Sequence, residues 1–311
     1  MIETTTTMRD SICLVTGATG GMGAVIARAL AARGATVVLV GRDAHRGAAV
    51  QRAIVQATGN TAVHLLLADL SSQQEIRHLA RQFQQRYDRL HVLVNNAGAH
   101  VMQRQVSPDG IEMTLAVNHL AGFLLTGLLL DTLRASAPAR IVNVASNAMT
   151  KTIDLDDLQS TRSYASMRVY GQAKLASVLC TYALARRLAG SGVTANALHP
   201  GLTGTGIVDT MAPPLLRPFT GLIKRVMLTP EQGARTALYL ATAPAVEGVS
   251  GRYFVREKAA RSVPMSYNVA LQERMWAISA GLTGLESTAT TVALPTLVRS
   301  FHAPSLASSR P

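Results

Sequence analysis

A tyrosine and a lysine stand four residues apart in the segment Tyr170-Gly171-Gln172-Ala173-Lys174. On a helix, residues four apart lie on the same face, so the phenol and the ammonium would be neighbours. A phenol with a pKa near 10 is about one part in a thousand ionised at pH 7, and its use at that pH requires roughly 4 kcal/mol of phenolate stabilisation. A lysine cation can supply such stabilisation. The spacing therefore indicates acid–base chemistry, although without further motifs a surface pair is the better interpretation.

A glycine-rich segment comes directly after the first apolar run of the chain and directly before a helical pattern. Its glycines are Gly17, Gly20, Gly21 and Gly23, and Thr19 and Met22 stand between them. Glycines at such a junction permit a tight turn and a close approach of the backbone to a pyrophosphate, while the helix N-terminus offers free N–H groups to the anion. Glycines also occur in ordinary turns, but the order strand, loop, helix favours a dinucleotide site.

The end of the second predicted strand bears on which dinucleotide binds. It reads Gly41-Arg42-Asp43. A carboxylate at this point would bind a ribose 2′-hydroxyl, whereas an arginine suits a 2′-phosphate, so Arg42 favours NADP(H) over NAD(H). The alternative is that Arg42 faces solvent or caps a helix, with Asp43 as the N-cap.

Three motifs together resemble those of the short-chain dehydrogenase/reductase family. They are Thr-Gly-x-x-x-Gly-x-Gly over residues 16–23, Asn95-Asn96-Ala97-Gly98 after the fourth predicted strand, and Tyr170-x-x-x-Lys174. Within the family, residues 109–126, 157–160, 174–176 and 251–254 resemble retinol dehydrogenase-like reductases, and the similarity covers about residues 10–285. The resemblance implies hydride transfer between a nicotinamide and a carbonyl or alcohol group of a small molecule.

The resemblance also implies catalytic tasks for four residues. Tyr170 would transfer a proton to or from the substrate oxygen, and Ser146 would polarise that oxygen. Lys174 would lower the pKa of Tyr170 and hold the nicotinamide ribose. Asn118 would complete a proton relay through a water held between its backbone and Lys174. Ser146 matches the second position of the family's usual Ser-Ser pair, and Ala145 occupies the first.

A cofactor site is implied in the same way. Its residues would be Gly17, Thr19, Gly20, Gly21, Met22, Gly23, Arg42, Asp69, Leu70, Asn96, Ala97, Gly98, Tyr170, Lys174, Pro200, Gly201, Thr203 and Thr205. Asp69 would meet the exocyclic amine of adenine, unless it is a plain helix cap. Thr205 belongs to a stretch that would contact the nicotinamide carboxamide. His199, at a strand end, is expected to be structural.

These residues need elements that bring them to one edge of a sheet. Apolar runs at residues 12–16, 36–40, 62–67, 91–95, 140–145, 193–198 and 251–255 predict about seven strands, and amphipathic stretches near 21–33, 43–58, 72–87, 110–135, 165–190 and 230–242 predict helices. Continuously apolar strands separated by helices indicate an α/β fold, a Rossmann-type doubly wound parallel sheet with helices on both faces. Ligands bind such a sheet at the carboxyl ends of its strands. Thr229, Pro230 and Gln232 further predict a helix start with a capping box.

We expect a single domain over residues 11–285, with a flexible N-terminus over 1–10. Residues 286–311 are expected to form a disordered tail, because Ser, Thr and Pro are frequent there and no acidic residue follows Glu286. The segment 202–228 follows the sixth strand and is expected to close over the substrate as a lid. Its apolar side chains favour a lipophilic small-molecule substrate, although a lid that packs on the protein would look similar.

Composition narrows the other function classes. The 30 Lys and Arg residues against 18 Asp and Glu residues give a net charge of +12, but they are scattered and aromatic residues make up only 4% of the chain, so nucleic-acid binding is not expected. The apolar run 113–130 contains Asn118 and is expected to be a buried helix rather than a membrane span. Two cysteines in apolar runs and the lack of a signal-peptide pattern favour a cytoplasmic protein.

No metal-ligand spacing is visible among the histidines, cysteines and acidic residues. Three acidic residues cluster ahead of the tyrosine, at Asp154, Asp156 and Asp157. We expect them to form a solvated loop or a helix cap.

Two other functions stay open from the sequence. A protochlorophyllide reductase-like enzyme would share the motifs, and a redox-sensing regulator would bind NADP(H) without turnover. The intact set of Ser146, Tyr170 and Lys174 argues against the regulator. Substrate identity, stereochemistry, physiological direction and the formation of a homo-oligomer are not predicted.

Overall fold

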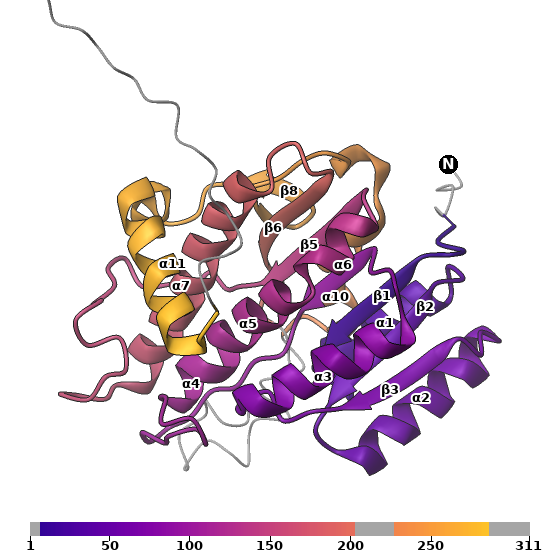
Figure 1. Cartoon of the computed structure of the whole chain (residues 1–311), viewed down its shortest axis with the longest axis horizontal. Coiled ribbons are helices and arrows are strands. Elements are labelled where there is room, and N and C mark those ends of the chain that lie inside the picture. The colour runs from indigo at the N-terminus through magenta and orange to yellow at the C-terminus, as the bar shows by residue number, and fades with distance from the viewer. Residues whose placement is uncertain (1–6, 203–226, 286–311) are drawn as a thin grey trace, which may run out of the picture.

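The structure of the protein is a computed structural model that describes residues 7–202 and 227–285. One eight-stranded sheet in the order β3-β2-β1-β4-β5-β6-β7-β8 lies at its centre, with helices on both faces (Figure 1). Neighbouring strands pair in parallel except for β7 and β8. The strands are β1 (Ile12–Thr16), β2 (Thr36–Gly41), β3 (Val63–Leu67), β4 (Val92–Asn95), β5 (Ala139–Val144), β6 (Val193–His199), β7 (Tyr253–Val255) and β8 (Lys258–Ala260). The predicted doubly wound parallel sheet is confirmed.

Helices cover both faces of the sheet, as strands that are apolar on both sides require. One face carries α1 (Gly21–Ala31), α2 (Ala44–Thr58) and α10 (Pro230–Thr242), and the other carries α3 (Gln73–Arg86), α5 (Ala121–Leu128), α6 (Leu130–Ala135) and α7 (Ser166–Arg187). Strand β1 shows the alternation, since Cys13 and Val15 join one core and Leu14 joins the other. The short elements α4 (Met113–Leu115), η3 (Pro244–Val246) and η4 (Pro264–Tyr267) and the helix α11 (Val269–Thr283) complete this part of the chain.

The eighth strand is an addition to the seven or so that the sequence predicted. It joins β7 through a tight turn in which Arg256 and Glu257 have φ angles of 50° and 64°. A two-residue turn of this hand matches the natural twist of a hairpin. All three residues of β8 are exposed, so no apolar alternation marks the strand in the sequence.

The apolar run 113–130 is helical, as predicted, but it is not one regular helix. A π-helical turn, η1 (Ala116–Leu120), separates α4 from α5. Asn118 lies inside this turn, and π-turns within α-helices are frequent at functional sites. Among the helices of residues 7–202 and 227–285, none combines the length and hydropathy that a membrane span requires.

Residues 227–285 contain one α-helix that the sequence predicted and one that it did not. Thr229 caps α10 as expected, because its hydroxyl accepts the backbone N–H of Gln232 while Gln232 Oε1 accepts the N–H of Thr229. The buried residues of α11 are Gln272, Met275, Ser279 and Thr283, so its most buried face is largely polar and gave no apolar signal in the sequence. It packs against α7, where Glu273 forms ion pairs with Arg186 and Arg187.

Some predicted features fall on residues 1–6, 203–226 and 286–311, which lie outside the described residues. They are most of the N-terminal segment 1–10, nearly all of the lid 202–228 and the tail 286–311. The predicted cofactor residues Thr203 and Thr205 also lie outside the described residues.

Candidate active site

Tyr170 and Lys174 lie near the start of α7, one turn apart, as their spacing predicted. Lys174 Nζ is 5.7 Å from the centroid of the Tyr170 ring and donates a hydrogen bond to the carbonyl oxygen of Val144 over 3.0 Å. Because Val144 ends β5, this bond ties α7 to the carboxyl edge of the sheet. Ser146 follows two residues later, so three of the four predicted catalytic residues, Ser146, Tyr170 and Lys174, come together at that edge.

Gly171 allows α7 to approach the loop that carries Ser146. A Cβ atom on residue 171 would lie 2.6 Å from the carbonyl oxygen of Ala148, closer than side chains pack. The loop itself is braced, because the backbone N–H of Ala148 donates to Ser146 Oγ over 3.1 Å. The backbone N–H of Asn147 donates to His199 Nδ1 over 3.2 Å, so His199 has the structural place expected of it.

Burial controls the protonation of the site. It raises the pKa of Tyr170, and the Ser146 hydroxyl partly opposes that rise. Burial lowers the pKa of Lys174 to about 8. At pH 7 Tyr170 is therefore a protonated phenol and Lys174 is mostly an ammonium. The pair can release a proton from Tyr170 and stabilise the resulting phenolate with the charge of Lys174.

The side chain of Asn118 fixes the loop after β4. Its Oδ1 accepts the backbone N–H of Ala99 over 3.3 Å, and its Nδ2 donates to the carbonyl oxygen of Ala99 over 2.6 Å. The main-chain carbonyl oxygen of Asn118 accepts a hydrogen bond from Ser177 Oγ over 3.0 Å. The carbonyl that would hold the water of the implied relay is thus also within hydrogen-bond distance of the Ser177 hydroxyl. Ser177 was not predicted, and its only signal is a hydroxyl three residues after Lys174, on the same helix face.

The glycine-rich loop has the shape that a pyrophosphate site needs. Gly17 and Gly21 have φ angles of 64° and 52°, in the left-handed region that favours glycine. A Cβ atom on Gly23 would overlap the carbonyl oxygen of Gly17, so only glycine lets α1 start this close to β1. Gly20 is the N-cap of α1 and supplies no side-chain cap, which leaves the first N–H groups of the helix available to an anion.

The same loop is joined to the loop after β4. Thr16 Oγ1 accepts the backbone N–H groups of Asn96 and Ala97 over 3.0 and 3.1 Å. Asn96 Nδ2 in turn donates to the carbonyl oxygen of Thr16 over 2.8 Å. The predicted Asn96-Ala97-Gly98 segment therefore closes one side of the cofactor site, and the residues present fit a dinucleotide.

Two arginines and a glycine lie at the end of β2, next to this loop. A Cβ atom on Gly41 would overlap the methyl group of Thr19, so a carboxylate-bearing side chain does not fit at residue 41 unless Thr19 moves. Arg42 is exposed, and Asp43 is the N-cap of α2, accepting the N–H of Arg46 over 3.0 Å.

Arg46 is a candidate that the sequence analysis missed. Its Nη2 lies 3.1 Å from where a Cβ atom on Gly20 would stand, so the guanidinium reaches the phosphate loop. The first turn of α2 holds no acidic residue, and a cation there opposes the helix dipole. The signal that could have found it is a basic residue in the first turn of a helix, where acidic residues are favoured.

The remaining predicted cofactor residues follow β3 and β6. Asp69 is not the cap of α3, since Ser72 Oγ accepts the N–H of Glu75 there, whereas Asp69 Oδ1 accepts the N–H of Ser71 over 2.9 Å. Leu70 is buried beside it. Pro200 and Gly201 follow β6 directly, and Gly201 has a φ angle of 90°.

A family model for short chain dehydrogenase matches residues 11–214 of this chain. The chain belongs to the short-chain dehydrogenase family. Members of this family are oxidoreductases that use nicotinamide cofactors and act on alcohol and carbonyl groups, so this chain is an oxidoreductase of that class. The predicted family is confirmed.

Human proteins and solved structures extend the similarity of this short-chain dehydrogenase. It is 40% identical over 290 residues to human retinol dehydrogenase 13, covering 90% of this chain and 87% of that protein. It is 38% identical over 285 residues to human polyprenol dehydrogenase, covering 89% and 86%. The crystal structure of an uncharacterized protein from Mycobacterium paratuberculosis is similar with a TM-score of 0.73 and 29% identity, covering 90% and 96%. The structure of Pseudomonas aeruginosa RhlG in its NADP active-site complex is similar with a TM-score of 0.64 and 28% identity, covering 80% of this chain and 95% of that one.

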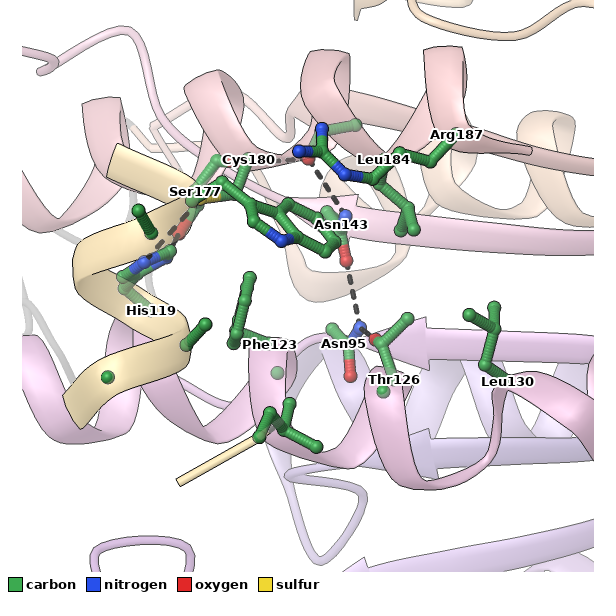
Figure 2. A pocket seen from close by; sticks show the side chains of 18 of the residues that line it. Asn95, His119, Phe123, Thr126, Leu130, Asn143, Ser177, Cys180, Leu184 and Arg187 are labelled. Carbon is green, nitrogen blue, oxygen red and sulfur yellow. Dashed lines mark hydrogen bonds between the residues drawn. The ribbon is translucent and has the colours of Figure 1, made fainter. Parts of the chain in front are cut away.

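A cavity of about 920 Å³ lies between α5, α7 and α11 of this short-chain dehydrogenase (Figure 2). Neither Tyr170 nor Ser146 lines it. On one wall Asn95 Nδ2 donates to Asn143 Oδ1 over 2.8 Å. The cavity runs along the side of α7 that carries Ser177, Cys180 and Thr181, and it reaches Asn118.

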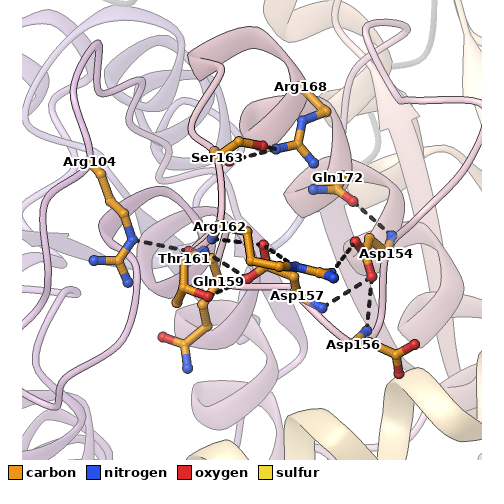
Figure 3. Close-up of polar contacts among 10 residues, drawn as sticks. All are labelled: Arg104, Asp154, Asp156, Asp157, Gln159, Thr161, Arg162, Ser163, Arg168 and Gln172. Carbon is orange, nitrogen blue, oxygen red and sulfur yellow. Dashed lines mark hydrogen bonds and ion pairs between the residues drawn. The ribbon is translucent and has the colours of Figure 1, made fainter.

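The segment before α7 is ordered by acidic side chains (Figure 3). Asp157 is 7% exposed and accepts the N–H and the hydroxyl of Thr161 over 2.7 and 2.8 Å, and these bonds hold its pKa well below the usual range. Asp154 pairs with Arg162 at 2.9 Å, and its N–H donates to Gln172, between Tyr170 and Lys174. The interpretation of the acidic run as solvated was wrong for Asp157. No cluster in the described ranges offers three His, Cys, Asp or Glu ligands to a metal.

Proposed function

We propose that this protein is an NADP(H)-dependent dehydrogenase or reductase whose substrate is the carbonyl or alcohol group of a lipophilic small molecule. The observation that carries the proposal is the meeting of Ser146, Tyr170 and Lys174 at the carboxyl edge of the sheet, beside the glycine-rich loop. The nicotinamide, when bound, supplies or accepts the hydride. The proton transfer and the binding of the substrate oxygen are carried out by residues of this chain.

The proton steps are assigned to the same three residues. In the reducing direction Tyr170 donates its hydroxyl proton to the carbonyl oxygen, and the Ser146 hydroxyl donates a hydrogen bond to that oxygen. Lys174 stabilises the phenolate, because its ammonium is held within 5.7 Å of the Tyr170 ring by the carbonyl of Val144. In the oxidising direction the phenolate takes the alcohol proton back.

Phosphate recognition is assigned to the arginines near the start of α2. Arg42 and Arg46 would supply positive charge to a ribose 2′-phosphate, and Gly41 carries no carboxylate for a 2′-hydroxyl, with Thr19 occupying the space that such a side chain would need. The binding of NADP by the similar RhlG supports this choice. A lipophilic substrate is supported by the names of the human relatives, which are a retinol dehydrogenase and a polyprenol dehydrogenase.

A screen of NADPH consumption tests the proposal. The protein is assayed in the dark and under illumination with decanal, retinal and acetaldehyde, with NADPH and with NADH. We expect turnover with NADPH. The kcat/KM for decanal and retinal should be at least about tenfold higher than that for acetaldehyde, because their longer apolar chains need to contribute only about 1.4 kcal/mol of contact for a factor of ten. Tight NADPH binding without turnover of any carbonyl would favour a redox sensor. Turnover that requires light would favour a protochlorophyllide reductase-like enzyme.

A further inference from the structure

His100 stands two residues after Gly98, in the loop that leaves the carboxyl end of β4. Its ring meets the ring of Tyr170 edge to face, with 5.8 Å between the centroids. The side chain is only 6% exposed, and neither ring nitrogen has a hydrogen-bond partner within residues 7–202 and 227–285. Leaving a buried polar group unpaired costs free energy, so a histidine here calls for a role beyond packing.

The backbone on both sides of His100 is held in place. On one side Asn118 binds both the N–H and the carbonyl oxygen of Ala99. On the other side the hydroxyl of Tyr164 donates to the carbonyl oxygen of Val101 over 2.8 Å. The imidazole therefore has a fixed position next to Tyr170, as a residue that selects a ligand must have.

Burial also determines what the imidazole can bind. It lowers the pKa of His100, so the ring is neutral at pH 7. A neutral imidazole offers one N–H donor and one nitrogen acceptor. A hydroxyl or an oxo group can therefore pair with it, whereas an alkyl group leaves both nitrogens unpaired.

We infer that His100 is a specificity-determining residue, which binds a second oxygen of the substrate close to the carbon that reacts at Tyr170. The inference rests on the proposed function, because it needs a carbonyl bound at Tyr170. Because the imidazole contacts the ring of Tyr170, an oxygen bound to it would lie close to the carbonyl that Tyr170 protonates. The substrate class is thus a lipophilic compound with neighbouring oxygens, such as a vicinal hydroxyketone or dione.

The test compares two substrates that share a carbon skeleton, decan-2-one and decane-2,3-dione, in the wild type and in two variants. A dione is intrinsically more reactive, so the quantity of interest is the change in the dione-to-monoketone ratio of kcat/KM. His100→Met keeps an apolar side chain of similar length, and His100→Gln keeps a donor and an acceptor. We expect the ratio to fall about tenfold or more in His100→Met and to stay within about threefold in His100→Gln, since one lost hydrogen bond to a buried group is a factor of this size.

Three further measurements distinguish substrate selection by His100 from a structural role or an action through its neighbours. The melting temperature of His100→Met should equal or exceed that of the wild type, because an unpaired buried group is removed; a large fall would show that the ring is structural. If kcat/KM falls equally for both substrates and the pH profile shifts, His100 acts through Tyr170 and the inference is wrong. If NADPH binding weakens, His100 acts through the cofactor and the inference is also wrong. Turnover with an unchanged ratio would contradict the inference alone. A wild type that turns over neither ketone nor aldehyde would contradict the proposed function and this inference with it.

Discussion

Lys174 spans from α7 to the end of β5, where its ammonium donates to the carbonyl oxygen of Val144 over 3.0 Å. The side chain is 3% exposed, and burial lowers its pKa to about 8. The positive charge that the proposed chemistry needs is therefore kept in an environment that disfavours it. At this residue the requirements of catalysis and of stability oppose each other.

The variant Lys174→Met should lose turnover. Its free energy of unfolding, compared with that of the wild type at different pH values, should show the cost of burying the ammonium. The unfolded chain binds more protons than the folded one between pH 8 and 10.5, so the wild type gains stability as pH rises through this window. The variant has no such group, so the difference between the two proteins should change by about 3 kcal/mol across the window. Denaturant unfolding at pH 7 and at pH 10.5 measures it. A difference that is the same at both pH values would show that the buried ammonium is not destabilising.

The variant Arg46→Leu tests the arginine that the sequence analysis did not find. We expect the KM for NADPH to rise about tenfold or more, because a charge-assisted hydrogen bond to a phosphate contributes about 1.5–3 kcal/mol. The KM for NADH should hardly change. The variant Arg42→Leu should show the same rise in the KM for NADPH. Arg52 is an exposed arginine further along α2, so Arg52→Leu is the matched control and should leave this KM unchanged. If NADH supports turnover as well as NADPH in the wild type, the phosphate assignment is wrong.

A pair of glycine variants tests the close approach of α7 to the loop of Ser146. Gly171→Ala should lower both the melting temperature and kcat, because its Cβ would lie 2.6 Å from the carbonyl oxygen of Ala148, and overpacking costs about 1–3 kcal/mol. Gly281→Ala in α11 meets nothing within 4 Å and should stabilise the protein by about 0.5–1 kcal/mol. Thermal unfolding and steady-state kinetics of both variants measure these changes in melting temperature and kcat. Unchanged kinetics in Gly171→Ala would mean that the contact does not position the site.

The variant Asp157→Asn tests the buried carboxylate in front of α7. Hydrogen bonds from Thr161 and Arg162 lower the pKa of Asp157 in the folded chain, so the stability they contribute is full above the ordinary carboxyl pKa and is lost as pH falls below it. The variant should therefore melt at a lower temperature than the wild type at pH 7. The gap should narrow as the pH is lowered below about 4. Thermal scans across this range measure it, and a gap that widens on acidification would refute this role of Asp157.

Much of the fold could be predicted because its signals are local and repeated. The seven parallel strands are apolar runs, and α10 begins at a capping box. The structure departs from the prediction where local patterns carry no information. The exposed residues of β8 are paired only because a tight turn folds them back, and α11 is tethered by ion pairs from Glu273 to a helix some 86 positions earlier in the chain.

For the candidate site, Ser146, Tyr170 and Lys174 lie at one edge of the sheet, while the contacts that support them did not follow from the sequence. The positions of Arg46 and Ser177 on their helices are visible in the sequence, but not that Arg46 reaches the loop of Gly20 or that Ser177 donates to Asn118. Such contacts depend on where separate elements meet. Asp157 was misjudged for the same reason, because its donors become visible only once the segment before α7 is folded.

The most direct test of the central claim is the variant Tyr170→Phe, which removes one hydroxyl and keeps the ring that packs against His100. We predict that NADPH binding, measured by titration, stays within about threefold of the wild type. Carbonyl turnover should fall by at least the 10²–10⁴-fold that a positioned acid contributes. Turnover within about tenfold of the wild type, with a folded protein and normal NADPH binding, would contradict the assignment of Tyr170 as the proton donor.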